Sequence, residues 1–174
     1  MVHLYIGDGK GKTTAALGCA LRALGWGKKV YCAQFLKDIN HPCGEIKAVK
    51  DYKLNIKIER FNGQTHPIFL NKHEVDIKKI KRSVTKSLAK IETFIRAKKF
   101  DMVILDEVLD TLAGKFISQK ILTRIIKNAN DTELILTGRT APSSVVRLAD
   151  YISFIGKIKH PFDKKVIARK SIDY

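Results

Sequence analysis

The stretch that decides the fold stands at the start of the chain. It reads Val2-His3-Leu4-Tyr5-Ile6, then Gly7-Asp8-Gly9-Lys10-Gly11-Lys12-Thr13-Thr14, then an Ala- and Leu-rich segment that ends at Leu24. The first part is a short apolar strand, and the last part repeats apolar residues at three- and four-residue steps, as a helix does. A glycine-rich turn between a strand and a helix exposes backbone N–H groups beside the positive end of the helix dipole. The stretch therefore predicts a phosphate-binding loop, or P-loop, for a nucleotide such as ATP.

Two side chains of this loop carry chemistry. We expect Lys12 to neutralise phosphate oxygens and the hydroxyl of Thr13 to ligate Mg²⁺. The usual spacing, G-x-x-x-x-G-K-[ST], would place a glycine at position 6, where this chain has Ile6. The loop is thus one residue short, and it contains an additional lysine, Lys10. This departure predicts that the phosphates do not take the usual pose.

Strands and helices alternate along the rest of the chain. Apolar runs and alternation predict strands at 2–6, 29–36, 55–61, 101–106, 133–137 and 151–155, and helical periodicity predicts helices at 13–24, 44–52, 74–98, 118–128 and 143–149. This order is typical of an α/β fold with a mostly parallel central sheet and helices on both faces. We expect one three-layer P-loop domain of the RecA-like type over residues 1–174, with its ligand at the carboxyl ends of the strands.

A second acidic motif follows the fourth expected strand. Residues 102–107 read Met-Val-Ile-Leu-Asp-Glu, an apolar strand that ends in two acids. P-loop proteins place a carboxylate that holds Mg²⁺ at this position, which is called Walker B. Asp106 is therefore the expected metal-side acid, and Glu107 is expected to contact metal, water or ribose.

The charge of the chain is unusual. Its 174 residues include 33 Lys and Arg against 17 Asp and Glu, which gives a formal net charge of +16. Such an excess indicates an anionic partner, or else lysines that only solvate helix surfaces. Lys and Arg residues are concentrated in the helix expected at 74–98, without the interleaved aromatic residues that binders of single strands need. This distribution does not favour a nucleic-acid partner.

The sequence also argues against a membrane protein, a secreted protein and a zinc-binding protein. No apolar run reaches the length of a membrane span, and the few residues before the loop are too short for a signal peptide, so we expect a cytoplasmic protein. The three cysteines and five histidines lack the spacing of zinc ligands.

Several motifs together resemble one family. They are G-D-G-K-G-K-T-T-A-A (7–16), A-L-R-A-L-G-W-G-K-K-V (20–30), Q-F-L-K (34–37), V-I-L-D-E (103–107), L-T-G-R-T-A-P (136–142), K-H-P-F-D (159–163) and A-R-K-S-I-D (168–173). In this order they resemble the ATP:corrinoid adenosyltransferases of the CobA type over nearly the whole chain. The short P-loop is itself similar to that of the family.

The resemblance implies a reaction. Such enzymes transfer the 5′-deoxyadenosyl group of ATP to the cobalt of a reduced, Co(I) corrinoid, and triphosphate leaves. The resemblance also implies Mg²⁺ as cofactor and a homodimer. From the charge alone we add the hypothesis of an acidic flavoprotein as the reductant.

The resemblance also assigns residues. It places Gly7 to Thr14 around the triphosphate and Arg22 near phosphate, and it gives catalytic roles to Lys12, Glu107 and Arg139. Thr13, Asp106 and Glu107 are the expected metal ligands. Lys37, at the end of the second strand, is a further candidate for the site, whereas His160 is expected to be structural.

The chain departs from the family pattern in two places. The family has a Phe-Thr-Trp-like stretch against the corrinoid, but residues 60–69 of this chain lack tryptophan, and Phe61 and Phe69 are the candidates to replace it. Lys165 and Ser171 stand where the family prefers glycine. Two alternatives therefore stay open: a P-loop nucleoside kinase that would release ADP, and a basic RecA-like ATPase that binds nucleic acid.

Overall fold

A single parallel sheet forms the centre of the molecule. A computed structural model describes residues 1–37, 43–61 and 77–173. Within these residues six strands pair in the order β3-β2-β4-β5-β1-β6, and every pairing is parallel. The strands are β1 (Val2–Ile6), β2 (Val30–Phe35), β3 (Ile56–Phe61), β4 (Met102–Asp106), β5 (Glu133–Gly138) and β6 (Tyr151–Phe154). The expected parallel sheet is confirmed.

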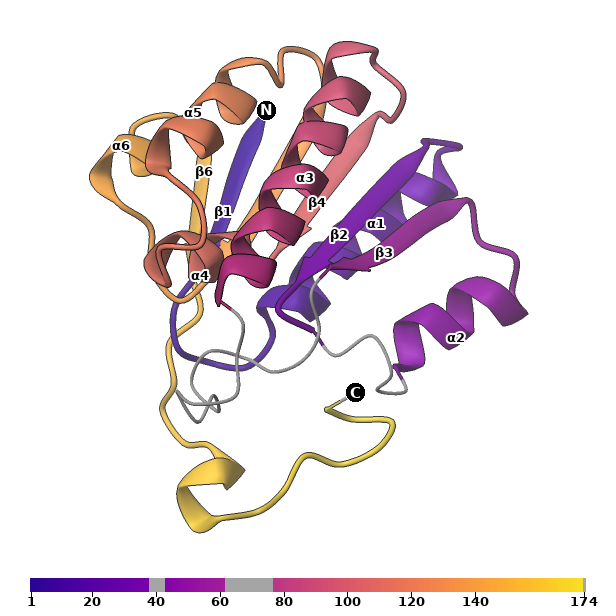
Figure 1. Cartoon of the computed structure of the whole chain (residues 1–174). Helices are drawn as coiled ribbons and strands as arrows, with labels where there is room; N and C mark the ends of the chain where they lie inside the picture. Colours follow the sequence, from indigo (N-terminus) through magenta and orange to yellow (C-terminus); the bar gives the residue numbers. More distant parts are fainter. Residues whose placement is uncertain (38–42, 62–76, 174) are drawn as a thin grey trace.

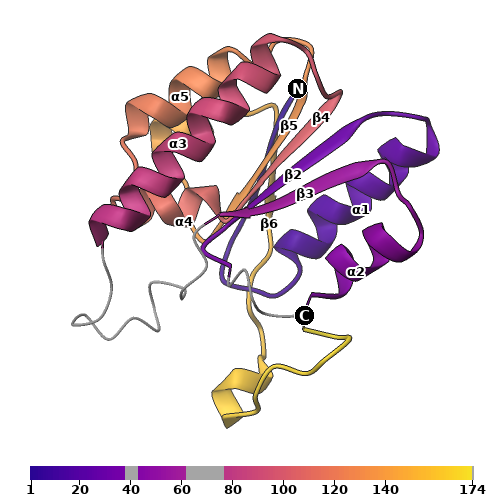
Figure 2. The same cartoon turned by 45° about the vertical axis from the view of Figure 1, so that its right-hand side comes forward.

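Helices cover both faces of this sheet. The two views place α1 and α2 on one face and α3, α4 and α5 on the other (Figures 1 and 2). The helices are α1 (Lys12–Gly25), α2 (Gly44–Asp51), α3 (Ile77–Arg96), α4 (Val108–Ala113), α5 (Gln119–Lys127) and α6 (Ser143–Val146), and a 3₁₀ turn spans Pro161–Lys164. The expected three-layer α/β fold is therefore confirmed. Within the described ranges, no helix combines the length and the apolarity that a membrane crossing requires.

Two apolar cores lie on opposite faces of the sheet. The larger one packs α3, α4 and α5 on the sheet, and α3 contributes Ile80, Val84, Leu88, Ile91 and Ile95 at three- and four-residue steps. The smaller one packs Ala16 and Ala20 of α1 on the other face. Because β2 and β4 are covered on both sides, their residues are buried throughout and read as continuous apolar runs rather than alternating ones.

The helix α4 is the element that the sequence did not predict. It starts directly after Glu107, with no glycine or proline between it and β4. The chain turns there because Glu107 itself takes the left-handed conformation, with φ of 60°. A side chain with a Cβ rarely adopts this conformation, so Glu107 was not a turn signal at the sequence level.

The sheet brings the two predicted motifs to one edge. The P-loop follows β1 and the acidic pair ends β4, and β5 lies between these two strands. All strands point the same way, so the loop and both acids meet at the carboxyl edge. The segment after β6 runs down past this edge and returns toward it at the C-terminus (Figure 1).

Candidate active site

The backbone of the P-loop is held by segments that follow β5 and β6. Gly7 N donates to the carbonyl of Arg139 (3.0 Å), and Gly9 N donates to the carbonyl of Ile155 (2.8 Å). A Cβ on Gly9 would lie 2.7 Å from the carbonyl oxygen of Gly156, and one on Gly7 would collide with the backbone of Ile155. The glycines thus allow close packing against the protein itself, besides leaving the loop open to a phosphate.

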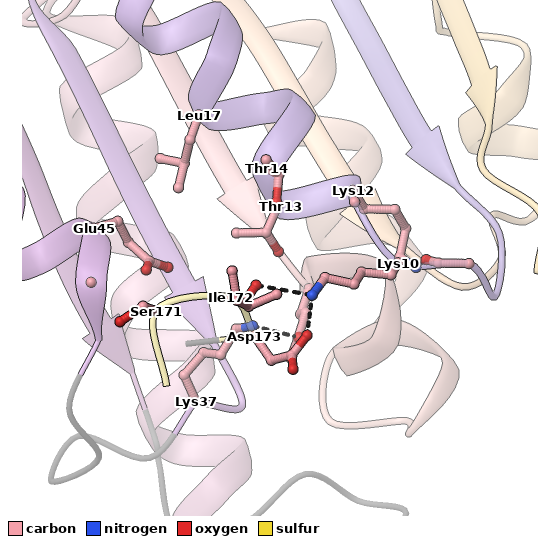
Figure 3. Close-up of a pocket in the computed structure, with 14 residues that line it drawn as sticks. Lys10, Lys12, Thr13, Thr14, Leu17, Lys37, Glu45, Ser171, Ile172 and Asp173 are labelled. Carbon is pink, nitrogen blue, oxygen red and sulfur yellow. Dashed lines mark hydrogen bonds and ion pairs between the residues drawn. The ribbon is translucent and has the colours of Figure 1, made fainter. Parts of the chain in front are cut away.

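Two lysines give the loop its charge, and they point in different directions. Lys12 Nζ donates to the carbonyls of Gly7 (2.7 Å) and Gly9 (2.8 Å), so its ammonium lies across the loop. Burial lowers the pKa of Lys12. Lys10 is exposed instead, and Figure 3 shows it turned toward the C-terminal residues Ile172 and Asp173.

Asp106 joins three elements beneath the loop. Its Oδ1 accepts hydrogen bonds from the hydroxyl of Thr13 at the start of α1 (2.9 Å) and from the hydroxyl of Thr137 on β5 (2.7 Å). The same Thr137 hydroxyl accepts from the backbone N–H of Glu107 (2.9 Å). The carboxylate is fully buried. The predicted metal-side residues Thr13 and Asp106 are thus in direct contact.

The backbone and the carboxylate of Glu107 are both in energetically unfavourable environments. It adopts φ of 60°, a conformation that L residues avoid. Burial raises the pKa of Glu107, the nearby charge of Asp106 raises it further, and Lys37 opposes the rise. Its Oε1 lies 3.0 Å from Lys37 Nζ, but its buried Oε2 has no hydrogen-bond partner among the described residues. Strain and incomplete pairing of this kind are typical of functional residues.

Lys37 is the positive group of this acidic cluster. Its Nζ also lies 3.9 Å from Asp106 Oδ2. Burial lowers the pKa of Lys37, but the charges of Glu107 and Asp106 outweigh burial and raise it above its ordinary value. The ammonium therefore stays charged at neutral pH between the two carboxylates.

These residues fit a magnesium ion that a nucleotide helps to bind. The free Oε2 of Glu107, the carboxylate of Asp106 and the hydroxyl of Thr13 are oxygen donors, which Mg²⁺ prefers. No cluster of three or more His, Cys, Asp and Glu side chains that would hold a metal occurs in the part of the chain that the structure describes. In nucleotide sites Mg²⁺ is usually held by one or two carboxylates together with substrate phosphates rather than by a complete protein cage.

One cavity of about 460 Å³ unites most of the predicted residues. Its lining includes Gly9 to Thr14 of the loop region, Lys37 and Glu107. Gly7 and Asp8 are not part of this lining; Asp8 accepts a hydrogen bond from Lys157 N (3.0 Å) behind the loop. The structure therefore brings the loop, the end of the second strand and Glu107 together at one cavity, whereas the fully buried Asp106 is not part of its lining.

The two predicted arginines lie apart from this lining. Arg139 fixes the loop through its backbone: its carbonyl binds Gly7, and its N–H donates to Asp110 Oδ1 (3.0 Å). Its side chain is exposed. Arg22 is exposed in the last turn of α1. It lies about 15 Å along the helix axis from Lys12, at 1.5 Å per residue.

Sequence reasoning missed several residues of the cavity wall. Leu17, Gly44 and Glu45 line it, as do Ser171, Ile172 and Asp173 of the C-terminal segment. Glu45 accepts a hydrogen bond from the buried Gln34 (3.2 Å), which in turn accepts one from Arg60 Nε (3.0 Å). The rule that ligands meet the carboxyl ends of strands could have pointed to the start of α2. The A-R-K-S-I-D motif marked residues 168–173 as similar to the family, but it did not place them in the cavity wall.

The structure explains some of the positions at which this chain departs from the family pattern. Lys165 and Ser171 have φ of 56° and 70°, so the positions where the family prefers glycine are left-handed here. Phe61 packs against Phe35 of the core, with ring centroids 5.7 Å apart, and Phe69 lies outside the described residues. His160 accepts a hydrogen bond from Phe162 N (3.1 Å) and caps the 3₁₀ turn, in line with the expected structural role.

Comparisons with known proteins agree with this geometry. A family model described as ATP:corrinoid adenosyltransferase BtuR/CobO/CobP matches residues 1–174. The corrinoid adenosyltransferase of Escherichia coli (strain K12) is 29% identical over 175 residues, which span 100% of this chain and 85% of that protein. The corrinoid adenosyltransferase CobA of Salmonella typhimurium is 29% identical over 183 residues, with 100% and 85% covered.

A solved structure shares the fold. The KaiC-like protein from Pyrococcus horikoshii OT3 superposes with a TM-score of 0.53 at 14% identity, over 91% of this chain and 74% of that one. At this identity the likeness concerns the fold alone, and it agrees with the RecA-like architecture.

Proposed function

Because this chain belongs to the ATP:corrinoid adenosyltransferase BtuR/CobO/CobP family, we propose that its cavity at the carboxyl edge holds the triphosphate of ATP during adenosyl transfer to a corrinoid. The family's activity holds over the alternatives of a nucleoside kinase and a nucleic-acid ATPase. One observation carries the proposal for the site: Lys10, Lys12, Thr13, Lys37 and Glu107 line the same cavity.

The proposed reaction needs no nucleophile from the protein. The Co(I) centre of the corrinoid substrate donates an electron pair to the ribose 5′ carbon, the bond from that carbon to oxygen breaks, and triphosphate leaves with the bonding pair. Catalysis then consists of positioning the 5′ carbon and of stabilising charge on the leaving group. The N–H groups of the loop supply the second function, together with Lys12, whose ammonium already lies across the loop.

We propose that Mg²⁺ binds to Thr13, Asp106 and Glu107. The support is the free Oε2 of Glu107 beside the Thr13–Asp106 hydrogen bond. When bound, the ion would neutralise part of the charge on the triphosphate. Thr137 and Lys37 would orient the two carboxylates, because each of them already contacts one or both.

The two predicted arginines differ in how well the geometry supports their roles. The charge of Arg139 lies close enough to Lys12 to lower the pKa of that lysine, although burial lowers it more. We propose that Arg139 adds positive potential at the loop. Arg22 is far along α1 from the loop, so its predicted contact with phosphate has no support in this geometry.

We also propose a docking face for the reductant. One side of α3 exposes a row of basic residues, Lys78, Lys79, Lys81, Arg82, Lys86 and Lys90. Such a row suits an acidic flavoprotein, because complementary charge speeds encounter. High salt should slow the flavoprotein-coupled reaction and leave the reaction with chemically reduced corrinoid unchanged. An unchanged coupled rate would contradict this face.

The predicted homodimer and cytoplasmic location stay predictions. The outer strand β6 pairs with β1 and exposes the apolar side chains of Tyr151, Ile152 and Phe154, which supports association with a second copy. Light scattering of the purified protein tests the dimer.

One assay tests the main proposal. The protein is incubated with ATP, Mg²⁺ and chemically reduced cob(I)alamin, and the corrinoid spectrum and the phosphate product are followed. We expect an adenosyl-corrinoid and inorganic triphosphate; ADP would indicate phosphoryl transfer instead.

Two variants locate the site in the same assay. Lys12→Ala should reduce turnover by about 100-fold or more, the range for loss of a charge-stabilising group. Lys28→Ala serves as a matched control, because Lys28 is an exposed lysine that pairs with Asp101 away from the loop. Near-normal activity of Lys12→Ala would contradict the assignment of the loop.

A further inference from the structure

The C-terminal segment folds back onto the P-loop at two points. Behind the loop, Lys157 N donates to Asp8 Oδ1 (3.0 Å). In front of it, Lys10 Nζ donates to the carbonyl of Ile172 (2.9 Å) and forms an ion pair with Asp173. Figure 3 shows this second contact at the cavity, with Asp173 and Ile172 across from the loop. The segment thus places a carboxylate in the wall of a cavity built for an anion.

The carboxylate of Asp173 is held in place without Lys10. Its Oδ2 accepts hydrogen bonds from Arg169 N (2.8 Å) and Arg169 Nε (3.2 Å), whereas its Oδ1 faces Lys10. The contact with Lys10 lowers the pKa of Asp173, so the group is an anion at neutral pH. The negative charge would remain at the cavity if Lys10 turned away.

We propose that Asp173 competes with triphosphate for Lys10 and thereby weakens the hold of the loop on the product. This inference rests on the proposed function, in which the loop binds the triphosphate of ATP. Breaking the bond to the 5′ carbon leaves a further negative charge on the triphosphate oxygen. Asp173 therefore repels the released product more strongly than it repels bound ATP.

The exposure of the pair makes such an exchange feasible. The side chain of Lys10 is 44% exposed and that of Asp173 is 22% exposed. Exposed ion pairs contribute little, so a highly charged ligand can displace the carboxylate from the lysine. The pair is thus weak enough to open on every turnover, and it reforms when product departs.

Calorimetric titration with inorganic triphosphate and with ATP tests the competition. Asp173→Asn should tighten triphosphate binding by about two- to fivefold, which corresponds to the loss of an exposed ion pair, and it should tighten ATP binding less. The gain should shrink when Asp173→Asn is combined with Lys10→Met. Asp163→Asn is the matched control, since Asp163 pairs with Lys157 in the same segment, and it should change nothing.

The outcomes of these titrations distinguish failure of this inference from failure of the proposed function on which it rests. Triphosphate binding that is unchanged or weaker in Asp173→Asn, or an equal gain with and without Lys10, would overturn the competition while the loop assignment stands. Failure of the wild-type protein to bind triphosphate would overturn both. In turnover assays the inhibition constant for added triphosphate should fall by the same two- to fivefold in Asp173→Asn, and a constant equal to that of the wild type would count against the inference.

Discussion

Two glutamate–lysine clusters of this protein differ in how completely they are paired. In the first, which we call the Glu59 cluster, Glu59 on β3 binds Lys57 (2.8 Å), Lys90 (2.8 Å) and the hydroxyl of Tyr31 (2.7 Å). Burial opposes ionisation there, but these hydrogen bonds lower the pKa of Glu59 to about 2. The cluster ties β2, β3 and α3 together, so it serves the fold.

The second, which we call the Glu107 cluster, consists of Glu107, Lys37 and Asp106. Here burial raises the pKa of Glu107, one of its oxygens has no partner among the described residues, and its backbone is left-handed. The same residue types thus give a satisfied structural network in one place and an unsatisfied one in the other. The difference indicates that the Glu107 cluster awaits a ligand.

The largest expected effect breaks the Glu107 cluster. Glu107→Gln should reduce adenosyl transfer by about 100-fold, because it removes a charged ligand from the proposed metal site. Urea unfolding at pH 7 should not show a loss of stability, since burial of this carboxylate is unfavourable. Glu59→Gln is the matched control for activity and should keep the turnover of the wild type. A strong loss of stability in Glu107→Gln would instead make the residue structural.

The next effect tests the lysine of the same cluster. Lys37 lowers the pKa of Glu107, so Lys37→Met should raise that pKa further above its already raised value. A carboxylate with a higher pKa is protonated over more of the acid range. We therefore expect activity that is lost at a higher pH than in the wild type as the solution is acidified and that recovers as the pH rises, which is the direction for loss of an opposite charge. A pH–rate profile measures this shift, and an acid limb at the same pH as in the wild type would contradict the pairing.

A smaller effect breaks the Glu59 cluster. The pKa of Glu59 is lowered from 4.5 to about 2, so its contribution to stability is complete above pH 4.5 and is lost as the pH falls toward 2. Glu59→Gln should lower the free energy of unfolding by about 1 kcal/mol at pH 7, a modest value because solvent screens the exposed lysines. Urea unfolding at pH 7 and pH 3 should show a smaller gap at the lower pH; an equal gap would exclude the linkage.

The smallest effect removes one partner of Glu59. The side chain of Lys57 is 53% exposed, and Glu59 keeps Lys90 and Tyr31 when it is lost. Lys57→Met should therefore change the free energy of unfolding by only a few tenths of a kcal/mol and leave activity unchanged. A loss as large as that of Glu59→Gln would mean that the cluster depends on this one pair.

The fold followed from local patterns with few exceptions. Apolar runs predicted β4 and β5, and helical periodicity predicted α1 and α3, because the side chains that face the core are spaced as each element requires. The helix α4 was missed because its start depends on a left-handed glutamate, a conformation that local sequence does not favour. The first residues of the helix expected at 74–98 lie outside the described residues.

The motifs of the candidate site were also predictable from the sequence, but their distant partners were not. By itself the sequence determined the P-loop, the acidic end of β4, the parallel sheet that joins them and the membership in the family. These rest on short-range spacing and on motifs that stay contiguous in the chain.

Only the tertiary structure decided the partners of these motifs. It set Lys37 between Glu107 and Asp106, gave Glu45 a place in the cavity wall and laid Asp173 against Lys10, which is 163 residues away in the chain. Such contacts depend on how the strands are ordered and on where the C-terminal segment returns. No local pattern encodes that return, because the charge of a lysine or an aspartate does not specify which distant partner will neutralise it.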